Sequence, residues 1–106
     1  MSFKWPSKAP QEVLDYSFDW SRLLETSTNI LSATWLIKYE GQPSVAFPVT
    51  TTVYGLTNNA QSINGKVTTI FLASGALNRN YTLTCQIQDS LGRTTERTVS
   101  IAIRER

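Results

Sequence analysis

The chain has 106 residues, a formal net charge of +2 and no histidine. This length fits one domain that buries roughly 65% of the surface its unfolded form exposes, and the Lys and Arg residues are too few and scattered to form a nucleic-acid footprint. The missing histidine removes the usual general base and the commonest metal ligand, and no apolar run approaches the roughly 18 residues of a membrane span.

Residues 1–13 are predicted to form an extended arm. Pro6 and Pro10 remove backbone donors and disfavour helix in the residues before them, so we expect no regular ladder here. Phe3 and Trp5 either tuck back onto their own domain or anchor in a neighbouring protein. The arm also lacks the apolar stretch of a signal peptide, so we expect a soluble protein made in a cytoplasm.

The next segment is the cleanest alternation in the sequence and predicts a strand with one face on a core. Its apolar positions are Leu14, Tyr16, Phe18 and Trp20. The residues that follow, Ser21 to Thr26, break the alternation and are predicted to form a single helical turn or a loop, because Ser21 can cap a helix.

A longer strand is predicted over Ile30 to Tyr39. Its shared apolar face consists of Leu31, Ala33, Trp35, Ile37 and Tyr39, with Trp35 as the expected centre of the core. Glu40 to Pro43 then turns the chain. A period of two resumes from Val45 to Val53 across Pro48, and this proline argues for an edge strand or a strand start.

The middle of the chain predicts a loop followed by a hairpin. The loop is expected over Gly55 to Asn59. Gln61 to Ile63 and Val67 to Leu72 are predicted as short strands joined at Asn64-Gly65, since Asn-Gly between such strands is a strong hairpin signal.

Residues Tyr81 to Ile103 predict a second and longer hairpin. Its apolar positions are Tyr81, Leu83, Cys85, Ile87, Val99, Ile101 and Ile103, and the turn formers lie between Asp89 and Arg93. Cys85 has no partner for a disulfide and is expected as a small buried hydrophobe. Tyr81 either ties down the preceding corner with its hydroxyl, as in immunoglobulin-like folds, or is a half-buried strand aromatic.

Short strands at spacings near ten residues, with no long helix, predict an all-β fold. The best fit is an immunoglobulin-like or fibronectin-like antiparallel β-sandwich over residues 14–106, preceded by the extended arm.

Catalytic chemistry has little support in the residue pattern. Asp15 and Asp19 share a strand face but lie roughly 13 Å apart by strand rise, too far for a glycosidase pair, so a solvated face explains them better. A serine nucleophile would need a lysine or amine base, and no motif marks one. We therefore expect no enzyme, metal or cofactor.

Two weaker site hypotheses remain at this stage. Exposed aromatics beside amides could bind glycans, and the candidates are Tyr54, Asn58 and Asn59. The terminal residues Arg104, Glu105 and Arg106 either guard an exposed edge as solvated charges or place an arginine at a partner's carboxylate.

Both ends of the chain resemble a family of small proteins encoded by tailed bacteriophages and prophages. The resemblance is carried by Phe3 to Lys8 and Glu12 to Ser21, and by Arg93 to Val99 with the ending through Arg106. It implies a virion component with a β-sandwich fold and no catalytic residue. The family does not fix which part of the particle the protein occupies.

We therefore expect a non-enzymatic virion structural protein, assembled in the host cytoplasm. It would serve as a capsid decoration or cement protein, or as a head-to-tail or tail accessory module, and bind other virion proteins in multiple copies with weak contacts multiplied by symmetry. The expected contact residues are Phe3, Trp5, Lys8, Arg104 and Arg106. Extended termini could also add a strand to a neighbouring sheet. The alternative is a carbohydrate-binding adhesion module that aids host attachment.

Overall fold

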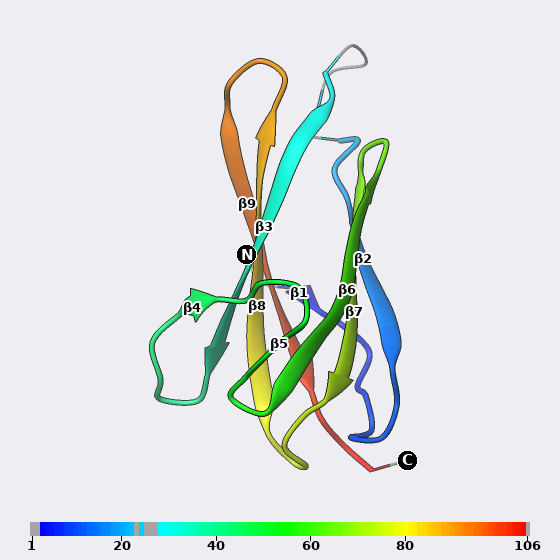
Figure 1. The fold of residues 1–106 in the computed structure, drawn as a ribbon, viewed down its shortest axis with the longest axis vertical. Coiled ribbons are helices and arrows are strands. Elements are labelled where there is room, and N and C mark those ends of the chain that lie inside the picture. Colours follow the sequence, from blue (N-terminus) through cyan, green and yellow to red (C-terminus); the bar gives the residue numbers. More distant parts are fainter. Residues whose placement is uncertain (1–2, 23, 25–27, 106) are drawn as a thin grey trace.

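The computed structural model describes residues 3–22, 24 and 28–105, and within these ranges it contains strands and no helix. The strands are β1 (Phe3–Lys4), β2 (Leu14–Asp19), β3 (Ile30–Tyr39), β4 (Val45–Ala46), β5 (Thr51–Val53), β6 (Leu56–Asn64), β7 (Val67–Ser74), β8 (Asn80–Asp89) and β9 (Thr94–Ala102). One sheet has the order β1-β9-β8-β3-β4 and the other β2-β7-β6-β5. Figure 1 shows the two sheets packed face to face. The predicted β-sandwich is confirmed.

The strand order follows the immunoglobulin arrangement. Strands β9, β8 and β3 take the places of G, F and C, and they face β2, β7 and β6 in the places of B, E and D. Trp35 lies on β3 and is 2% exposed, which is the position of the buried tryptophan on strand C. Among the described strands, the ladders are antiparallel except the parallel one between β1 and β9.

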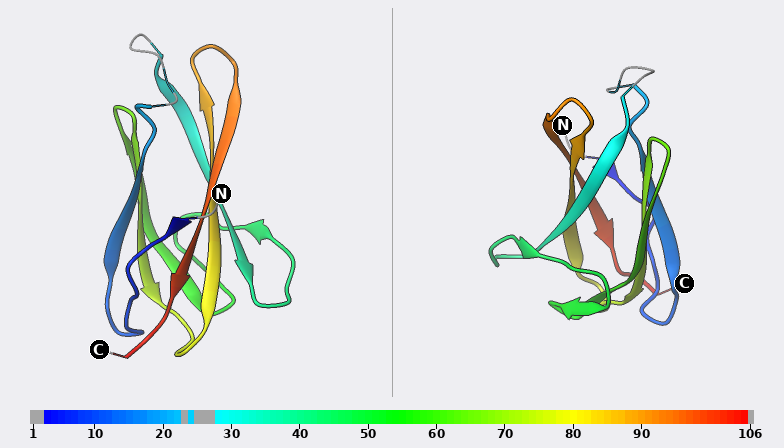
Figure 2. Two further views of the ribbon diagram at one scale, coloured as in Figure 1. Left: turned by 180° about the vertical axis from the view of Figure 1, so that it is seen from behind. Right: turned by 45° about the horizontal axis from the view of Figure 1, so that its top comes forward.

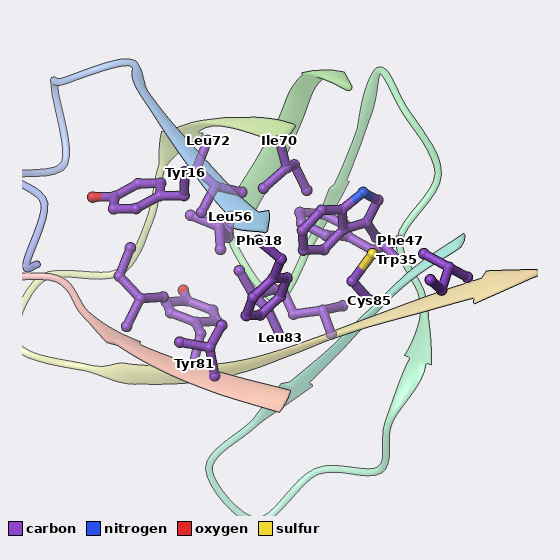
Figure 3. Close-up of a cluster of buried hydrophobic side chains, with 14 of the residues drawn as sticks. Tyr16, Phe18, Trp35, Phe47, Leu56, Ile70, Leu72, Tyr81, Leu83 and Cys85 are labelled. Atoms are coloured by element: carbon purple, nitrogen blue, oxygen red, sulfur yellow. The ribbon is translucent and has the colours of Figure 1, made fainter. Parts of the chain in front are cut away.

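The core forms where the alternating apolar faces of the two sheets meet (Figure 3). Its buried members are Tyr16, Phe18, Trp20, Leu24, Ile30, Trp35, Ile37, Phe47, Leu56, Ile70, Leu72, Tyr81, Leu83, Cys85, Ile87, Val99, Ile101 and Ile103. The predicted inward faces of β2 and of the β8–β9 hairpin are confirmed. At the hairpin's turn, Asp89 Oδ1 accepts hydrogen bonds from the backbone N–H groups of Leu91 and Arg93.

The hydroxyl of Tyr81 ties down the corner before β8. It donates to the carbonyl oxygen of Tyr54 at 2.7 Å and accepts from the backbone N–H of Ala76 at 3.0 Å. Burial raises the pKa of this phenol, although the hydrogen bond from Ala76 acts the other way. The corner interpretation is therefore correct, and the half-buried alternative is wrong because Tyr81 is fully buried.

One predicted inward residue of β3 faces solvent instead. Leu31 is 64% exposed, while Ile30 is buried. The register between β3 and β8 shifts between Ile30 and Ser32, and a bulge of this kind reverses the alternation on one side of it. The remainder of the predicted face is retained from Ala33 to Tyr39.

The predicted strand from Val45 to Val53 is wrong as one element. The chain forms β4 on the edge of the first sheet, crosses over at Phe47 to Thr50, and forms β5 on the edge of the second. Pro48 cannot donate to a ladder, and Thr50 has φ of 66°, so the backbone turns between the sheets. The proline's indication of an edge is confirmed for both strands.

The predicted loop at Gly55 to Asn59 is also wrong, because β6 begins at Leu56. The turn is tighter than expected: Tyr54 and Gly55 both have positive φ, 53° and 86°, as a two-residue hairpin turn requires. The hairpin predicted around Asn64-Gly65 is confirmed, with Asn64 paired to Val67 and the turn at Gly65 and Lys66.

Part of the predicted turn or loop over Ser21 to Thr26 is described. Ser21 and Arg22 lie in a turn, and the N–H of Leu24 donates to the carbonyl oxygen of Trp20 at 3.1 Å. Leu23 and residues 25–27 lie outside the described residues.

Candidate partner-binding surfaces

The N-terminal arm docks on its own domain along the edge of β9 (Figure 2). Strand β1 runs parallel to β9, and Trp5 N–H donates to the carbonyl oxygen of Ser100 at 2.9 Å. Further along, Lys8 N–H donates to Ala102, and Arg104 N–H donates to Lys8 at 2.9 Å. The expectation of an arm without a regular ladder is wrong, because β9 offers a free edge, Pro6 falls between the bonded residues Trp5 and Lys8, and Pro10 lies beyond them.

Trp5 closes the gap between the two sheets on the side of β9 and β2. Its ring stacks on Tyr16 with 4.8 Å between centroids and packs at 5.2 Å against Phe18 and 6.2 Å against Trp35. The Tyr16 hydroxyl donates to the carbonyl oxygen of Pro6 at 3.1 Å. Of the two alternatives for the arm, tucking back is correct for Trp5. The side chain of Phe3 lies outside the described residues.

Lys8, expected as a partner contact, is fully buried. Its ammonium donates to the carbonyl oxygens of Ala9, Pro10 and Ser74, so it ties the arm to the end of β7. Burial lowers the pKa of this amine, and the charge of Glu12 partly opposes that shift. Lys8 therefore acts inside the chain and is not part of the exposed surface.

Arg104 is half-buried and joins the arm by its backbone. Its guanidinium donates to the carbonyl oxygen of Ile103 at 3.0 Å and to Asn80 Oδ1 at 3.3 Å. These contacts hold the last described residues beside the start of β8. Arg106 lies outside the described residues.

The three glycan candidates do not form one exposed surface. Asn58 is buried in β6, where its amide donates to the carbonyl oxygen of Phe47 and to Gln61 Oε1. Tyr54 stacks on Tyr39 at 5.7 Å and donates its hydroxyl to Pro43. Asn59 is exposed at a bulge in the pairing of β6 with β7.

A charged hollow lies beside Trp5 on the closed side of the sandwich. It has a volume of about 290 Å³ and is lined by Lys4, Trp5, Ser17, Phe18, Asp19 and Arg97. Arg97 donates to the carbonyl oxygen of Asp19, and its guanidinium lies 5.2 Å from the centroid of the Trp20 ring. The hollow is thus built from the arm, β2 and β9 together.

A different surface lies on the opposite side, between β3 and β6. Two adjoining hollows of about 230 and 270 Å³ share Ala33, Trp35 and Gln61. Strand β4 pairs only with Leu36 and Ile37 of β3, and β5 pairs only with residues 56–58 of β6. Most of the outer edge of β3 and of β6 therefore has no paired strand on this side.

The open side was missed by sequence reasoning, although a signal was present. No charged residue occurs from Gly41 to Gly65, or from Thr28 to Ile37. Depletion of charge is typical of the central part of a protein interface. The strands on this side come entirely from these two segments, apart from the last two residues of β3.

Within the described residues, no cluster of histidine, cysteine or acidic side chains is arranged to hold a metal, and no helix could cross a membrane. Asp15 and Asp19 are both exposed on β2, as expected for a solvated face. Cys85 is buried beside Thr68, and burial raises the pKa of its thiol to about 11. A thiol with that pKa is a weak nucleophile at neutral pH.

Comparison with known proteins identifies the family. No individually curated protein matches the chain. Residues 8–102 match the family described as "Podophage GP4 fiber-tail adaptor protein gp77". The resemblance to phage virion proteins is thereby confirmed at the level of the family. Because the match runs from within the arm to the end of β9, the chain belongs to this family of structural podophage tail proteins.

Proposed function

We propose that the chain is a non-enzymatic adaptor that links a tail fibre to the podophage tail. The observation that carries this proposal is the family match over residues 8–102, which spans almost the whole sandwich. It favours the tail over the capsid surface, the other location considered from the sequence. The glycan alternative has no assembled site, since Asn58 is buried and the Tyr54 hydroxyl donates to the carbonyl oxygen of Pro43.

The geometry supports a linking role because the molecule has two dissimilar sides. The side covered by the arm carries charged groups around Trp5, including Lys4 and Arg97. The opposite side has open strand edges and two hollows whose lining contains no charged residue. An adaptor must contact two different proteins, and surfaces of different chemistry keep the two contacts distinct. Several copies around the tail, assembled in the host cytoplasm, would add avidity to weak single contacts.

The proposal is tested on phage particles from which the gene has been deleted and then restored. We expect cryo-electron microscopy of complemented particles to show density of this domain's size between tail and fibres. Particles without the protein should carry tails but lack attached fibres. Density that follows the capsid lattice, or fibres retained without the protein, would overturn the proposal. Specific glycan binding by the isolated protein would instead support the adhesion alternative.

A further inference from the structure

The open side of the sandwich exposes main-chain groups that could accept another strand. The N–H of Phe47 donates to the carbonyl oxygen of Trp35 at 2.9 Å, so Trp35 directs its backbone groups toward the β4 side. Backbone direction alternates along a strand, and Ala33 therefore faces the same side. Strand β4 has already ended there, since the chain leaves at Pro48. Ala33 is thus the next hydrogen-bonding position on β3 after Trp35, beyond the point where the β3–β4 ladder ends.

The groove beside this edge has places for side chains. The two hollows meet at Ala33, Trp35 and Gln61, and their outer walls include Val49 and Ile63. Val49 is 42% exposed and Ile63 is 40% exposed, so apolar surface is left uncovered along the groove. A strand lying on β3 would point every second side chain into the groove, because successive residues face opposite sides.

The usual protection of an exposed edge is missing on this side. Edge strands are commonly guarded by lysine or other charges that discourage pairing. From Thr28 to Ile37 and from Gly41 to Gly65 no charged residue is present. On the opposite side, β1 of the same chain covers the edge of β9, and the edge strand β2 carries the exposed charges Asp15 and Asp19. The unguarded edge is therefore confined to β3 and β6.

We propose that the groove between β3 and β6 receives an extended, uncharged segment of the tail fibre, which pairs with the main chain at Ala33 and seats apolar side chains in the two hollows. This inference rests on the proposed adaptor function. Main-chain pairing supplies affinity in such strand addition, and the hollows supply specificity. A charged segment would lose hydration without finding an opposite charge in this groove.

A second copy of this chain is a poorer occupant than a fibre segment. The extended part of the chain is the arm, which is already paired with β9 and stacked through Trp5. The arm also carries Lys4 and Lys8, and Lys8 is buried by its own domain. Inserting the arm of a neighbour would require these contacts to break first.

The test uses overlapping synthetic peptides of about ten residues, near the upper length of natural strands, that tile the tail fibre of the same phage. Amide hydrogen exchange and chemical shifts of the full chain are followed by NMR as each peptide is added. We expect an uncharged peptide to slow exchange at Ala33 and to shift Gln61 and Ile63. Protection confined to the β9 side, or no binding by any peptide, would overturn the inference.

Two substitutions in the groove and one control sharpen the test. Ala33→Pro removes the N–H that faces the open edge, and we expect at least about tenfold weaker peptide binding, corresponding to loss of one hydrogen bond. Ile63→Lys places a charge on the groove wall and should weaken binding similarly without a change in the core. The control is Leu91→Lys, at an exposed leucine in the β8–β9 turn, and it should bind like the unmodified chain.

The same variants in phage separate this inference from the proposed function. If Ile63→Lys particles keep their fibres while gene deletion removes them, the adaptor role holds and the groove inference fails. If deletion leaves the fibres attached, the adaptor role itself fails. Protection at Ala33 that grows with protein concentration, without peptide, would show a second copy in the groove and also overturn the inference.

Discussion

The two sides of the sandwich differ in how completely their strand edges are covered. On one side, the arm covers the edge of β9 and Trp5 fills the space between β9 and β2. On the other side, β4 and β5 cover only short parts of β3 and β6, and two hollows remain between them. The closed side contains charged groups, whereas the open side contains none from Gly41 to Gly65.

This difference shows that the domain does not need a partner to complete its core. The core residues that meet between the sheets are buried within one chain, and Trp5 is supplied from the arm. The open edge therefore remains as surface that folding has not used. Trp35 connects the two sides, because its ring packs against Phe18 and Trp5 and it also lines both hollows.

The largest expected effect is from Trp35→Ala, which breaks both sides at once. Loss of this buried ring should lower the free energy of unfolding by about 3–5 kcal/mol through lost burial and the cavity left behind. Urea denaturation followed by far-UV circular dichroism measures the change. Leu91→Ala is the exposed control and should stay within about 0.5 kcal/mol. An equally small loss for Trp35→Ala would show that the two sides do not share this residue.

Trp5→Ala opens the closed side alone. We expect a loss of about 2–3 kcal/mol, below the full value for a buried tryptophan because Trp5 is partly exposed. The matched control is Lys4→Ala, the exposed neighbour that ends β1, which should cost less than about 0.5 kcal/mol. The comparison would fail if both substitutions had the same effect, since the arm would then contribute only its backbone.

Much of the fold could be predicted from the sequence where one rule governed a whole segment. The alternation in β2 and in the β8–β9 hairpin predicted the buried faces, and Asn64-Gly65 predicted the hairpin between β6 and β7. The exceptions have local causes that a period of two does not contain. A bulge turned Leu31 outward, and Pro48 divided one predicted strand between two sheets.

The candidate site was harder to predict, because it depends on pairing partners distant in sequence. Lys8 looked like a surface cation, but its ammonium donates a hydrogen bond to the carbonyl oxygen of Ser74, 66 residues away. Asn58 looked like a loop residue, but β6 extends through it. The uncharged stretch was visible in the sequence, yet its meaning depends on the short length of β4 and β5, which leaves the edges open.

Tyr81→Phe tests the corner where the chain from the open side meets the connection to β8. The substitution keeps the ring but leaves the carbonyl oxygen of Tyr54 and the N–H of Ala76 without this hydroxyl. We expect a loss of about 1–2 kcal/mol, the usual range for a removed buried partner. Thermal unfolding measures it, and amide exchange at Ala76 should rise. An unchanged exchange rate at Ala76 would contradict the assigned role of the hydroxyl.

The smallest expected effect is from Leu31→Lys, on the open edge of β3. Leu31 is 64% exposed beyond the bulge, so its replacement should change the free energy of unfolding by less than about 0.5 kcal/mol. A lysine at this place would supply the charge that guards other edge strands, and we expect weaker binding of an uncharged fibre peptide, followed by NMR as above. Leu91→Lys adds the same charge away from the edge and should leave peptide binding unchanged. A loss of stability above about 1 kcal/mol would show that Leu31 packs into the core, and an equal effect of both lysines on peptide binding would show that net charge, rather than the open edge, controls it.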